Sequence, residues 1–311
     1  MPTLPTELVL GVDVGGTQTT VAIGTAEGSI LSARTGPSHA DRGFPAMWSA
    51  LTSAIRRELD AVPTRPSAIG VSIGGPVSSR DGVVYSPPNL PGWDAIPLVR
   101  LLQEEFSLPV FIEHDAKAGA LAEWMFGAGR GQRNLIFLTL GTGLGAGLII
   151  DGRLCHGRRN NIGEVGHWRM AEDGPDLYGK PGSWEGFSSG AGLAAAAAIA
   201  KPAWWRPGAT AATVFGYARS GDPAAVDLVA EFALRLGHGV ALLVDLLAPE
   251  SVILGSLAVR AGDLFLPQVQ RIVDSECTDR NLPCPVVPAA LGDSLGTAAA
   301  LAVAVAGGSQ S

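Results

Sequence analysis

The sequence predicts an α/β fold built from two similar halves. Apolar strand segments alternate with helical segments along the 311 residues, which is the pattern of α/β domains. A strand–glycine turn–strand unit begins each half, first at Leu8–Gly24 and again at Asn134–Ile150. Hydrophobic residues make up 47% of the chain and charged residues 16%, so a sizeable core can form. We therefore expect a duplicated architecture with a cleft between the halves.

The first half begins with two strands that flank a Gly-Gly turn within Leu8–Gly24. Apolar residues at helical spacing, such as Met47, Leu51 and Ile55, then predict an amphipathic helix. The expected elements after the hairpin are the strand Ser29–Thr35, the helix Pro45–Val62, the strand Ala68–Ile73, the helix Ile96–Phe106 and the strand Pro109–Glu113.

The second half repeats the pattern. A strand at Asn134–Leu140 leads into the glycine-rich turn Gly141–Gly147 and a strand at Leu148–Ile150. A long helix is expected over Asp222–Leu247, with Asp222 as N-cap and Pro223 at the first helical position. The strand Ser251–Leu254 follows.

Composition and charge exclude several classes of protein. A formal net charge of -7 argues against a nucleic-acid binder, since phosphate contacts need clustered Lys and Arg. Three widely spaced cysteines, Cys155, Cys277 and Cys284, do not suit a disulfide scaffold. Neither a signal peptide nor an apolar stretch of about 18 residues is visible. We expect a soluble cytoplasmic protein without nucleic-acid or membrane partners.

The first motif that indicates chemistry is Asp13-Val14-Gly15-Gly16-Thr17. Two adjacent glycines let a backbone turn approach phosphate oxygens, and the amide groups there can form an anion-binding nest. Thr17 can add a hydroxyl donor, and Asp13 can hold Mg²⁺ through water. The alternative is an ordinary glycine hairpin with an incidental aspartate.

The second motif runs from Thr139 to Gly147. Gly141, Gly143 and Ala146 nominally fit a dinucleotide-binding fingerprint, but that fingerprint requires a helix to follow. Here Leu148–Ile150 predicts a strand. A second phosphate-binding hairpin that mirrors the first is therefore favoured over a Rossmann turn.

Six segments, spread in order from about residue 8 to 306, resemble the ROK family of sugar kinases. They are Asp13–Thr19, Glu113–Ala116, Leu140–Gly145, Gly163–His167, Val252–Gly255 and Leu291–Gly296. The resemblance implies an actin-like, ribonuclease-H-like duplicated fold, with ATP in an interdomain cleft, and a homodimer. We expect a smaller N-terminal domain of residues 1–113 plus the C-terminal helix 295–311, and a larger domain of residues 114–294.

The resemblance also implies an ATP-dependent kinase that phosphorylates the primary hydroxyl of a glucose-like sugar, with Asp115 as general base. A carboxylate there can accept the proton of the attacking hydroxyl. The alternative is that Asp115 is the helix N-cap before Ala116–Phe126. The expected acceptor-binding residues are Gly75, Asn89, His114, Asp115, Glu164, His167 and Glu185. The expected ATP-binding residues are Asp13, Gly15, Gly16, Thr17, Thr19, Gly141, Thr142, Gly143, Gly255 and Ser256.

One departure from the family pattern concerns zinc. Many ROK proteins bind zinc through His and a cysteine-rich segment, but Asp176, Tyr178 and Ser183 stand at the three cysteine positions here. These side chains cannot complete a closed structural zinc site. We predict no zinc, with His167 held by hydrogen bonds and Trp184 stiffening the loop.

A second departure concerns the acceptor. Glucose-preferring members have Asn before the catalytic Asp, whereas this chain has His114, and Lys117 replaces a residue that is usually neutral. Imidazole is bulkier and offers a different donor and acceptor set. An amino sugar or a C7 cyclitol is therefore a candidate beside glucose. The alternative is that the replacement is neutral and glucose is retained.

Two other functions compete with the kinase. Some ROK relatives are ligand-sensing regulators, but those carry an N-terminal helix-turn-helix, and here the phosphate motif starts at Asp13. A catalytically inactive sugar-binding protein is the other alternative. Retention of Asp13, Asp115 and both glycine-rich hairpins favours the enzyme.

Overall fold

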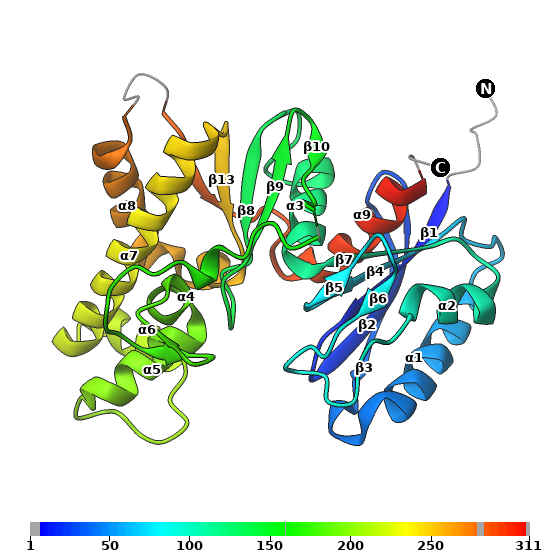
Figure 1. The fold of residues 1–311 in the computed structure, drawn as a ribbon, viewed down its shortest axis with the longest axis horizontal. Coiled ribbons are helices and arrows are strands. Elements are labelled where there is room, and N and C mark those ends of the chain that lie inside the picture. Colours follow the sequence, from blue (N-terminus) through cyan, green and yellow to red (C-terminus); the bar gives the residue numbers. More distant parts are fainter. Residues whose placement is uncertain (1–6, 159, 279–282, 309–311) are drawn as a thin grey trace. The chain divides into compact units, whose positions relative to one another are not determined.

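The computed structural model describes residues 7–158, 160–278 and 283–308, and β-strands form a five-stranded sheet in each of two units (Figure 1). Unit 1 comprises residues 1–130, 154–162 and 293–311, and unit 2 comprises residues 131–153 and 163–292. Among the described residues, no helix is long and apolar enough to cross a membrane.

The sheet of unit 1 has the strand order β3-β2-β1-β4-β7. β1 pairs antiparallel with β2, while β1, β4 and β7 run parallel. The elements of unit 1 are β1 (Leu8–Val14), β2 (Gln18–Thr25), β3 (Ile30–Pro37), η1 (Ala40–Arg42), α1 (Gly43–Asp60), β4 (Ile69–Ile73), β5 (Val77–Ser78), β6 (Val83–Val84), α2 (Leu98–Phe106), β7 (Val110–His114), α3 (Asp115–Phe126), η3 (Gly292–Ser294, which begins at the unit boundary) and α9 (Leu295–Gly308).

Helix α9 packs closely on the central strands of this sheet because two glycines face it. Gly11 and Gly70 are register partners on β1 and β4. A Cβ at Gly11 would lie 2.9 Å from the backbone N of Leu301, and one at Gly70 would lie 2.2 Å from the backbone O of Ala300. The Ala-rich helix therefore fits directly onto the strand backbones, and its Leu301 is fully buried.

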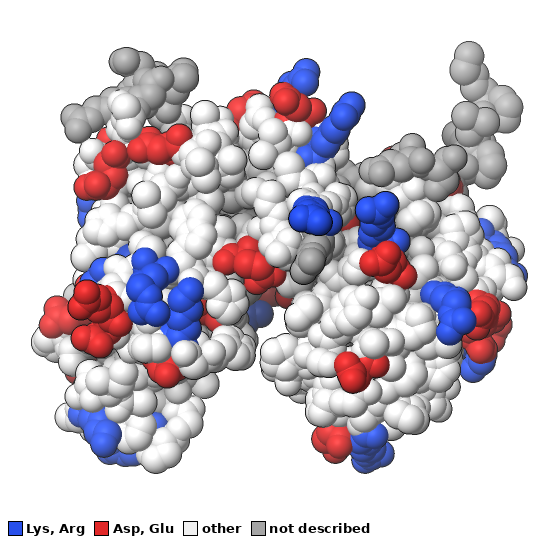
Figure 2. Space-filling view, in the orientation of Figure 1, with Lys and Arg blue, Asp and Glu red and all other residues white. Residues whose placement is uncertain are grey.

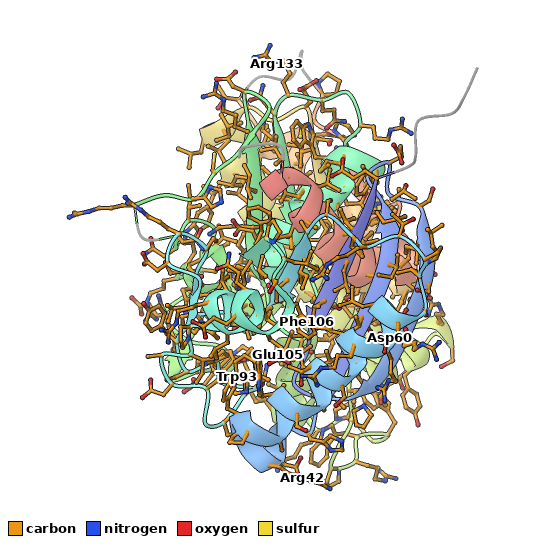
Figure 3. The ribbon with its side chains drawn as sticks, turned by 90° about the vertical axis from the view of Figure 1, so that its right-hand side faces the viewer. Arg42, Asp60, Trp93, Glu105, Phe106 and Arg133 are labelled. Carbon is orange, nitrogen blue, oxygen red and sulfur yellow. The ribbon has the colours of Figure 1, made fainter. Side chains whose placement is uncertain are left out.

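Helices α1 and α2 lie beside each other in unit 1, as Figure 3 shows around the labelled Glu105 and Phe106. The Arg56 guanidinium of α1 pairs with Glu105 and lies 5.9 Å from the Phe106 ring centroid. Trp93, in the loop before α2, is buried and meets the Phe44 ring edge-on at 5.1 Å. These contacts cover the apolar core of unit 1.

The sheet of unit 2 repeats that arrangement with the order β10-β9-β8-β13-β14. β8 pairs antiparallel with β9, and β8, β13 and β14 run parallel. The elements are β8 (Leu135–Leu138), β9 (Ala146–Ile150), β10 (Arg153–Leu154, which ends at the unit boundary), η2 (Val165–His167), β11 (Asp176–Leu177), β12 (Lys180–Pro181), α4 (Trp184–Ser188), α5 (Gly190–Ala200), α6 (Ala211–Arg219), α7 (Pro223–Leu247), β13 (Ser251–Leu254), α8 (Ser256–Glu276) and β14 (Val286–Pro288).

The long helix α7 begins as the sequence predicts. The Asp222 side chain accepts a hydrogen bond from the Ala225 amide at 3.0 Å, and Pro223 occupies the first turn. Phe232 of α7 meets Phe265 of α8 at 5.2 Å and Phe215 of α6 at 6.2 Å, both edge-on. This aromatic cluster joins the three helices of unit 2.

The two sheets confirm the predicted duplicated α/β fold, because both combine an antiparallel hairpin with three parallel strands. The observed units divide the chain differently from the expected boundary between residues 113 and 114. Helix α3 and residues 154–162 group with unit 1, because α3 packs against α9. Residues 1–6 and 309–311 of the expected N-terminal domain lie outside the described residues.

Charged side chains of both signs are interspersed on the face drawn in Figure 2. Among the described residues, that face carries no broad surface of Lys and Arg alone.

Candidate active site

The candidate residues of unit 1 gather where three parallel strands end. In the sheet register, Asp13 of β1 is opposite Ser72 of β4, and Ile73 is opposite His114 of β7. Asp115 follows directly as the first residue of α3. The carboxyl ends of parallel strands are the usual ligand-binding edge of an α/β sheet.

The first glycine turn is tight and lies against Asn89. The Gly15 amide donates to the Gln18 carbonyl at 3.0 Å, which closes the turn between β1 and β2. A Cβ at Gly16 would lie 2.9 Å from the Asn89 backbone O. The structure thus brings together Gly16, which the sequence predicted to bind ATP, and Asn89, which it predicted to bind the acceptor. Thr17 is exposed at the tip of the turn.

Thr19 takes a supporting position in this turn. Its hydroxyl lies 2.9 Å from the Ser38 hydroxyl, which donates to the Gly15 carbonyl at 2.6 Å. The Ser38 amide donates to the Thr17 carbonyl at 2.9 Å. Ser38 therefore braces the turn from β3's end, a role that no sequence motif indicated.

Asp13 is the candidate residue with the most perturbed acidity. Burial and the neighbouring Asp115 carboxylate raise its pKa from 3.8 to about 6, against a hydrogen bond with Ser72 that lowers it. Gly296, near the start of α9, lets the helix come this close, because a Cβ there would lie 2.3 Å from Asp13 Oδ2. The segment Leu291–Gly296 resembled the family, but the sequence assigned no role to Gly296.

His114, rather than Asp115, is the N-cap of α3, so the alternative of an Asp115 cap is wrong. His114 has extended backbone angles, and its Nδ1 accepts from the Ala116 amide at 3.3 Å. Asp115 already belongs to the helix, although its Oδ1 also accepts from the Ala116 amide at 2.7 Å. The Asp115 side chain is 52% exposed and open to a ligand.

The His114 ring faces Gly75. A Cβ at Gly75 would lie 2.6 Å from His114 Cδ2, so only glycine permits this approach. The ring also places Nδ1 3.1 Å from Asp115 Oδ1. The His114 imidazole therefore lies between Gly75 and Asp115, the predicted base. A substitution of His114 would remove its contacts with both residues.

The second glycine turn in unit 2 is closed by its own hydrogen bonds. The Gly141 amide donates to the Gly143 carbonyl at 3.0 Å, and the Thr139 amide donates to the Gly145 carbonyl at 2.9 Å. Strand β9 follows, which excludes the dinucleotide-binding fingerprint because that motif requires a helix. Thr142 is exposed at the turn, like Thr17 in unit 1.

Gly255 and Ser256 meet this turn from β13. A Cβ at Gly255 would lie 2.3 Å from the Thr139 carbonyl oxygen, so the glycine is needed for the approach. The Ser256 hydroxyl donates to the Leu140 carbonyl at 3.4 Å. The structure thus assembles the unit 2 residues predicted for ATP around one turn.

The three predicted acceptor-binding residues of unit 2 lie on adjoining segments. Glu164 precedes η2 and His167 ends it, with Oε2 and Nε2 4.0 Å apart. Gly166 lets η2 approach Glu185, because a Cβ there would lie 3.2 Å from Glu185 Cβ. Glu185 also accepts from the Leu144 amide at 2.7 Å. Glu164 and His167 therefore lie on a short helix that packs against Glu185, and Glu185 contacts the glycine turn.

The loop that carries cysteines in many relatives is held by other contacts here. Lys180 Nζ donates to the His167 carbonyl, and Arg169 Nη1 donates to the Pro181 carbonyl at 3.1 Å. The Trp168 and Trp184 rings stack at 5.7 Å. Asp176 and Tyr178 are exposed on this loop, whereas Ser183 is buried as the N-cap of α4.

The residues present fit a magnesium ion bound together with nucleotide. Among the described residues, no group of three or more His, Cys, Asp or Glu side chains could hold a metal by itself. Magnesium is usually held by one or two carboxylates plus substrate phosphates. Asp13 and Asp115 supply two carboxylates whose mutual repulsion a divalent cation relieves.

The sequence matches the ROK family over residues 9–306. It is 34% identical over 280 residues to a glucokinase of Streptomyces coelicolor, covering 85% of this chain and 86% of that protein. It is 30% identical over 279 residues to a xylose repressor of Caldicellulosiruptor bescii, covering 86% and 70%. The structure resembles a Streptomyces griseus ROK glucokinase in complex with glucose and AMPPNP, with a TM-score of 0.79, 31% identity and coverage of 96% and 99%.

Proposed function

Because this chain belongs to the ROK family and is an ATP-dependent sugar kinase with the actin-like fold, we propose that Asp115 is its general base. The acceptor is a glucose-like sugar or sugar analogue, either a hexose, an amino sugar or a C7 cyclitol, phosphorylated at its primary hydroxyl. The observation that carries this proposal is the exposed Asp115 carboxylate beside Asp13 at the ligand-binding edge of unit 1.

In the proposed reaction, the acceptor hydroxyl donates its proton to the Asp115 carboxylate while its oxygen attacks the terminal phosphorus of ATP. The bond to the bridging oxygen breaks and ADP leaves. Phosphoryl transfer needs positioning and charge stabilisation more than covalent participation of the protein. A base within hydrogen-bond reach of the hydroxyl contributes roughly 10²–10⁴-fold.

The two glycine turns bind the phosphates of ATP in this proposal. The Gly16 and Gly143 amides are the donors, while Gly15 and Gly141 shape the two turns through their own hydrogen bonds. The exposed Thr17 and Thr142 add hydroxyls to this set. Asp13 would hold a magnesium ion through water, and the ion would supply positive charge against the phosphate oxygens. Gly255 and Ser256 lie beside the second turn and contact the nucleoside part.

In this proposal five polar residues supply donors and acceptors to the sugar: Asn89, His114, Glu164, His167 and Glu185. Carboxylates accept hydrogen bonds from sugar hydroxyls, and imidazole donates or accepts. His114 favours acceptors other than glucose itself. At the position before Asp115 it presents an imidazole ring, where glucose-preferring relatives present the amide of an asparagine.

A ligand-sensing regulator is the second candidate, and its support is the likeness to the xylose repressor. A catalytically inactive sugar-binding protein is the third. Both predict acceptor binding without phosphorylated product. The exposed carboxylate of Asp115 favours the enzyme over both, since a binding protein needs no base at that position.

A coupled assay of ADP release with glucose, amino sugars and cyclitols tests the proposal, with product confirmed by mass spectrometry. Asp115→Asn removes the base and keeps the helix start, so kcat should fall at least about 100-fold, with acceptor binding retained by calorimetry. Asp151→Asn is the matched control, because Asp151 is an exposed turn aspartate of unit 2. If acceptors bind and the wild type forms no phosphorylated product, the regulator or binding protein is correct.

A further inference from the structure

The chain makes an unusual return to unit 1 in the middle of unit 2. Residues 154–162, which we call the return segment, begin at Leu154, the last residue of β10, and end directly before Gly163 and Glu164. The structure describes this segment apart from residue 159. It therefore connects, in sequence, a part of unit 1 with a predicted acceptor-binding residue of unit 2.

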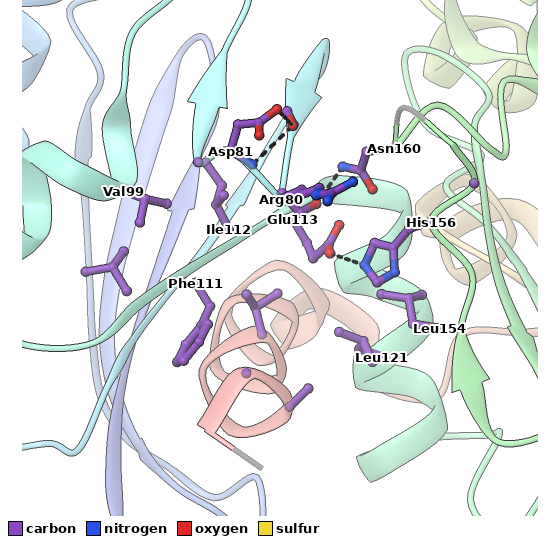
Figure 4. Close-up of a pocket in the computed structure, with 18 of the residues that line it drawn as sticks. Arg80, Asp81, Val99, Phe111, Ile112, Glu113, Leu121, Leu154, His156 and Asn160 are labelled. Atoms are coloured by element: carbon purple, nitrogen blue, oxygen red, sulfur yellow. Dashed lines mark hydrogen bonds and ion pairs between the residues drawn. The ribbon is translucent and has the colours of Figure 1, made fainter. Parts of the chain in front are cut away.

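The first anchor of the return segment is His156. Its Nε2 lies 2.5 Å from Glu113 Oε1 (Figure 4). The Glu113 side chain is only 8% exposed, and its Oε2 is buried with no hydrogen-bond partner among the described residues. Since a buried carboxylate is costly unless it is paired, the His156 contact compensates the burial of this group.

The second anchor is Asn160. Its carbonyl oxygen and Oδ1 accept from Lys117 Nζ at 2.6 and 2.7 Å, although Lys117 is only 1% exposed. Its Nδ2 donates to the Val77 carbonyl at 3.1 Å and to the Ser79 hydroxyl at 2.5 Å. Asn160 has a φ of 58°, a left-handed conformation that Asn tolerates better than most residues.

These hydrogen bonds contribute much of what holds the return segment in place, because one side of the segment borders a cavity. A cavity of about 1060 Å³ in unit 1 is lined by Leu154, His156, Gly157, Arg158 and Asn160 together with residues of β7 and α9. Figure 4 shows His156 and Asn160 at its edge. Close packing therefore cannot replace the hydrogen bonds along that side of the segment.

The two anchors lie symmetrically around the predicted base. Glu113 is two residues before Asp115 and Lys117 is two residues after it. Asn160 is four residues before Glu164, and an extended chain advances at most about 3.6 Å per residue. Anchoring Asn160 therefore restricts the movement of Glu164, and the same contacts restrict the strand end and helix start that carry Asp115.

We propose that Glu113 and Lys117 are positioning residues, which act through His156 and Asn160 to hold the return segment and so align the base with the acceptor-binding Glu164. This inference rests on the proposed kinase function. It assigns a role to Lys117, whose departure from the family's neutral residue had no explanation in the sequence. It also explains why an ammonium is buried in the first turn of α3.

Lys117→Met and Asn160→Gly test the second anchor. Methionine keeps the length of the side chain and removes the donor. Glycine keeps the left-handed backbone and the backbone carbonyl, and it removes the Oδ1 acceptor together with the Nδ2 donor to Val77 and Ser79. We expect each variant to lower kcat and raise the acceptor KM, each roughly tenfold, with the KM for ATP changed less than about twofold. The double variant should lose less than the product of the two single effects, because both single variants remove the hydrogen bond between Lys117 Nζ and Asn160 Oδ1.

Conservative changes and a control separate positioning from general stability. Asn160→Asp keeps an acceptor for Lys117 and should retain most of the activity, and His156→Gln should retain more than His156→Ala. Glu58→Gln is the matched control, because Glu58 of α1 is also fully buried and bonded to another element, strand β3, through Ser32 and Arg34. It should lower the melting temperature without changing the ratio of the two KM values.

Hydrogen exchange measured by mass spectrometry provides a readout that does not depend on turnover. Lys117→Met should speed exchange in the return segment and in the first turn of α3. Wild-type kinetics in Lys117→Met, or equal rises in both KM values, would overturn the positioning role. If the wild-type protein phosphorylates no acceptor, the proposed function fails, and unchanged exchange in Lys117→Met then also refutes the anchoring.

Discussion

Glu185 Oε2 accepts a hydrogen bond from the backbone amide of Leu144 at 2.7 Å. One residue proposed to bind the acceptor therefore also shapes the turn proposed to bind the phosphates of ATP. The geometry goes further, because a Cβ at Gly143 would lie 2.6 Å from the same Glu185 oxygen. A single carboxylate thus joins the proposed acceptor site and the proposed phosphate-binding turn within unit 2.

Glu185→Ala should accordingly impair both substrates. Loss of the carboxylate removes an acceptor for sugar hydroxyls and leaves the Leu144 amide without its partner, so the KM values for acceptor and ATP should both rise, each about tenfold. Glu185→Gln retains an oxygen for the Leu144 amide and should raise mainly the acceptor KM. Steady-state kinetics with each substrate varied in turn measure this. A normal KM for ATP in Glu185→Ala would contradict the structural link.

Asp13→Asn should change how stability depends on pH. The folded-state pKa of Asp13 is raised from 3.8 to about 6, so the folded state holds this proton more tightly than the unfolded chain. The stabilisation is present below pH 4 and is lost as the pH rises through about 6. Without magnesium and nucleotide, the free energy of unfolding of the variant should exceed that of the wild type by about 3 kcal/mol at pH 7.5 and by about half as much at pH 5.

Urea denaturation at several pH values measures this difference, with Asp60→Asn as a control at the exposed end of α1. An advantage of Asp13→Asn that stays constant between pH 5 and 7.5 would argue against the raised pKa. The same variant should lose kinase activity, since the proposed magnesium ligand is missing.

His114→Asn should shift acceptor preference towards glucose. Asparagine is also a good N-cap, so α3 should still begin normally. The imidazole that faces Gly75 is replaced by a smaller amide, and the ratio of kcat/KM for glucose to that for the best other acceptor should rise about tenfold. A competition assay with both acceptors in one reaction measures the ratio directly. No change in the ratio would falsify a role of His114 in acceptor choice.

Zinc removal should leave the protein unaffected. The loop between Trp168 and Trp184 is held by ring stacking and by the Lys180 and Arg169 hydrogen bonds. A zinc-selective chelator, in excess magnesium, should change neither the melting temperature nor the activity. Trp168→Ala should lower stability by about 1–3 kcal/mol, because it exposes part of the buried Trp184 ring. Elemental analysis that found one zinc ion per chain would contradict this prediction.

Local patterns predicted much of the fold. The strand Ser251–Leu254 was placed at both of its ends, and Asp222 with Pro223 located the start of α7. Each signal is short-range, because strand alternation, capping and proline geometry act within a few residues. The glycine turns were found for the same reason, since their function depends on adjacent residues.

The parts of the site that the sequence did not predict are long-range contacts. Lys117 meets Asn160 43 residues away, and no periodic pattern marks such a pair. The expected boundary after residue 113 differs from the observed units because the packing of α3 on α9 leaves no local signal. The sequence did not indicate Gly296 or Ser38, because their roles depend on contacts with distant residues. Gly296 lies against the Asp13 carboxylate, and Ser38 donates to the Gly15 carbonyl.

The close fit of α9 onto Gly11 and Gly70 has a consequence for biosynthesis. During translation β1 emerges early, but the helix that covers it is encoded near residues 295–308. At about 5–20 residues per second, the apolar strand face waits on the order of 15–60 s for its cover, while unit 2 is synthesised and folds. A chain released from the ribosome during that interval exposes the apolar face of the sheet and is prone to aggregate. Chaperones should therefore bind these incomplete chains more than the finished protein.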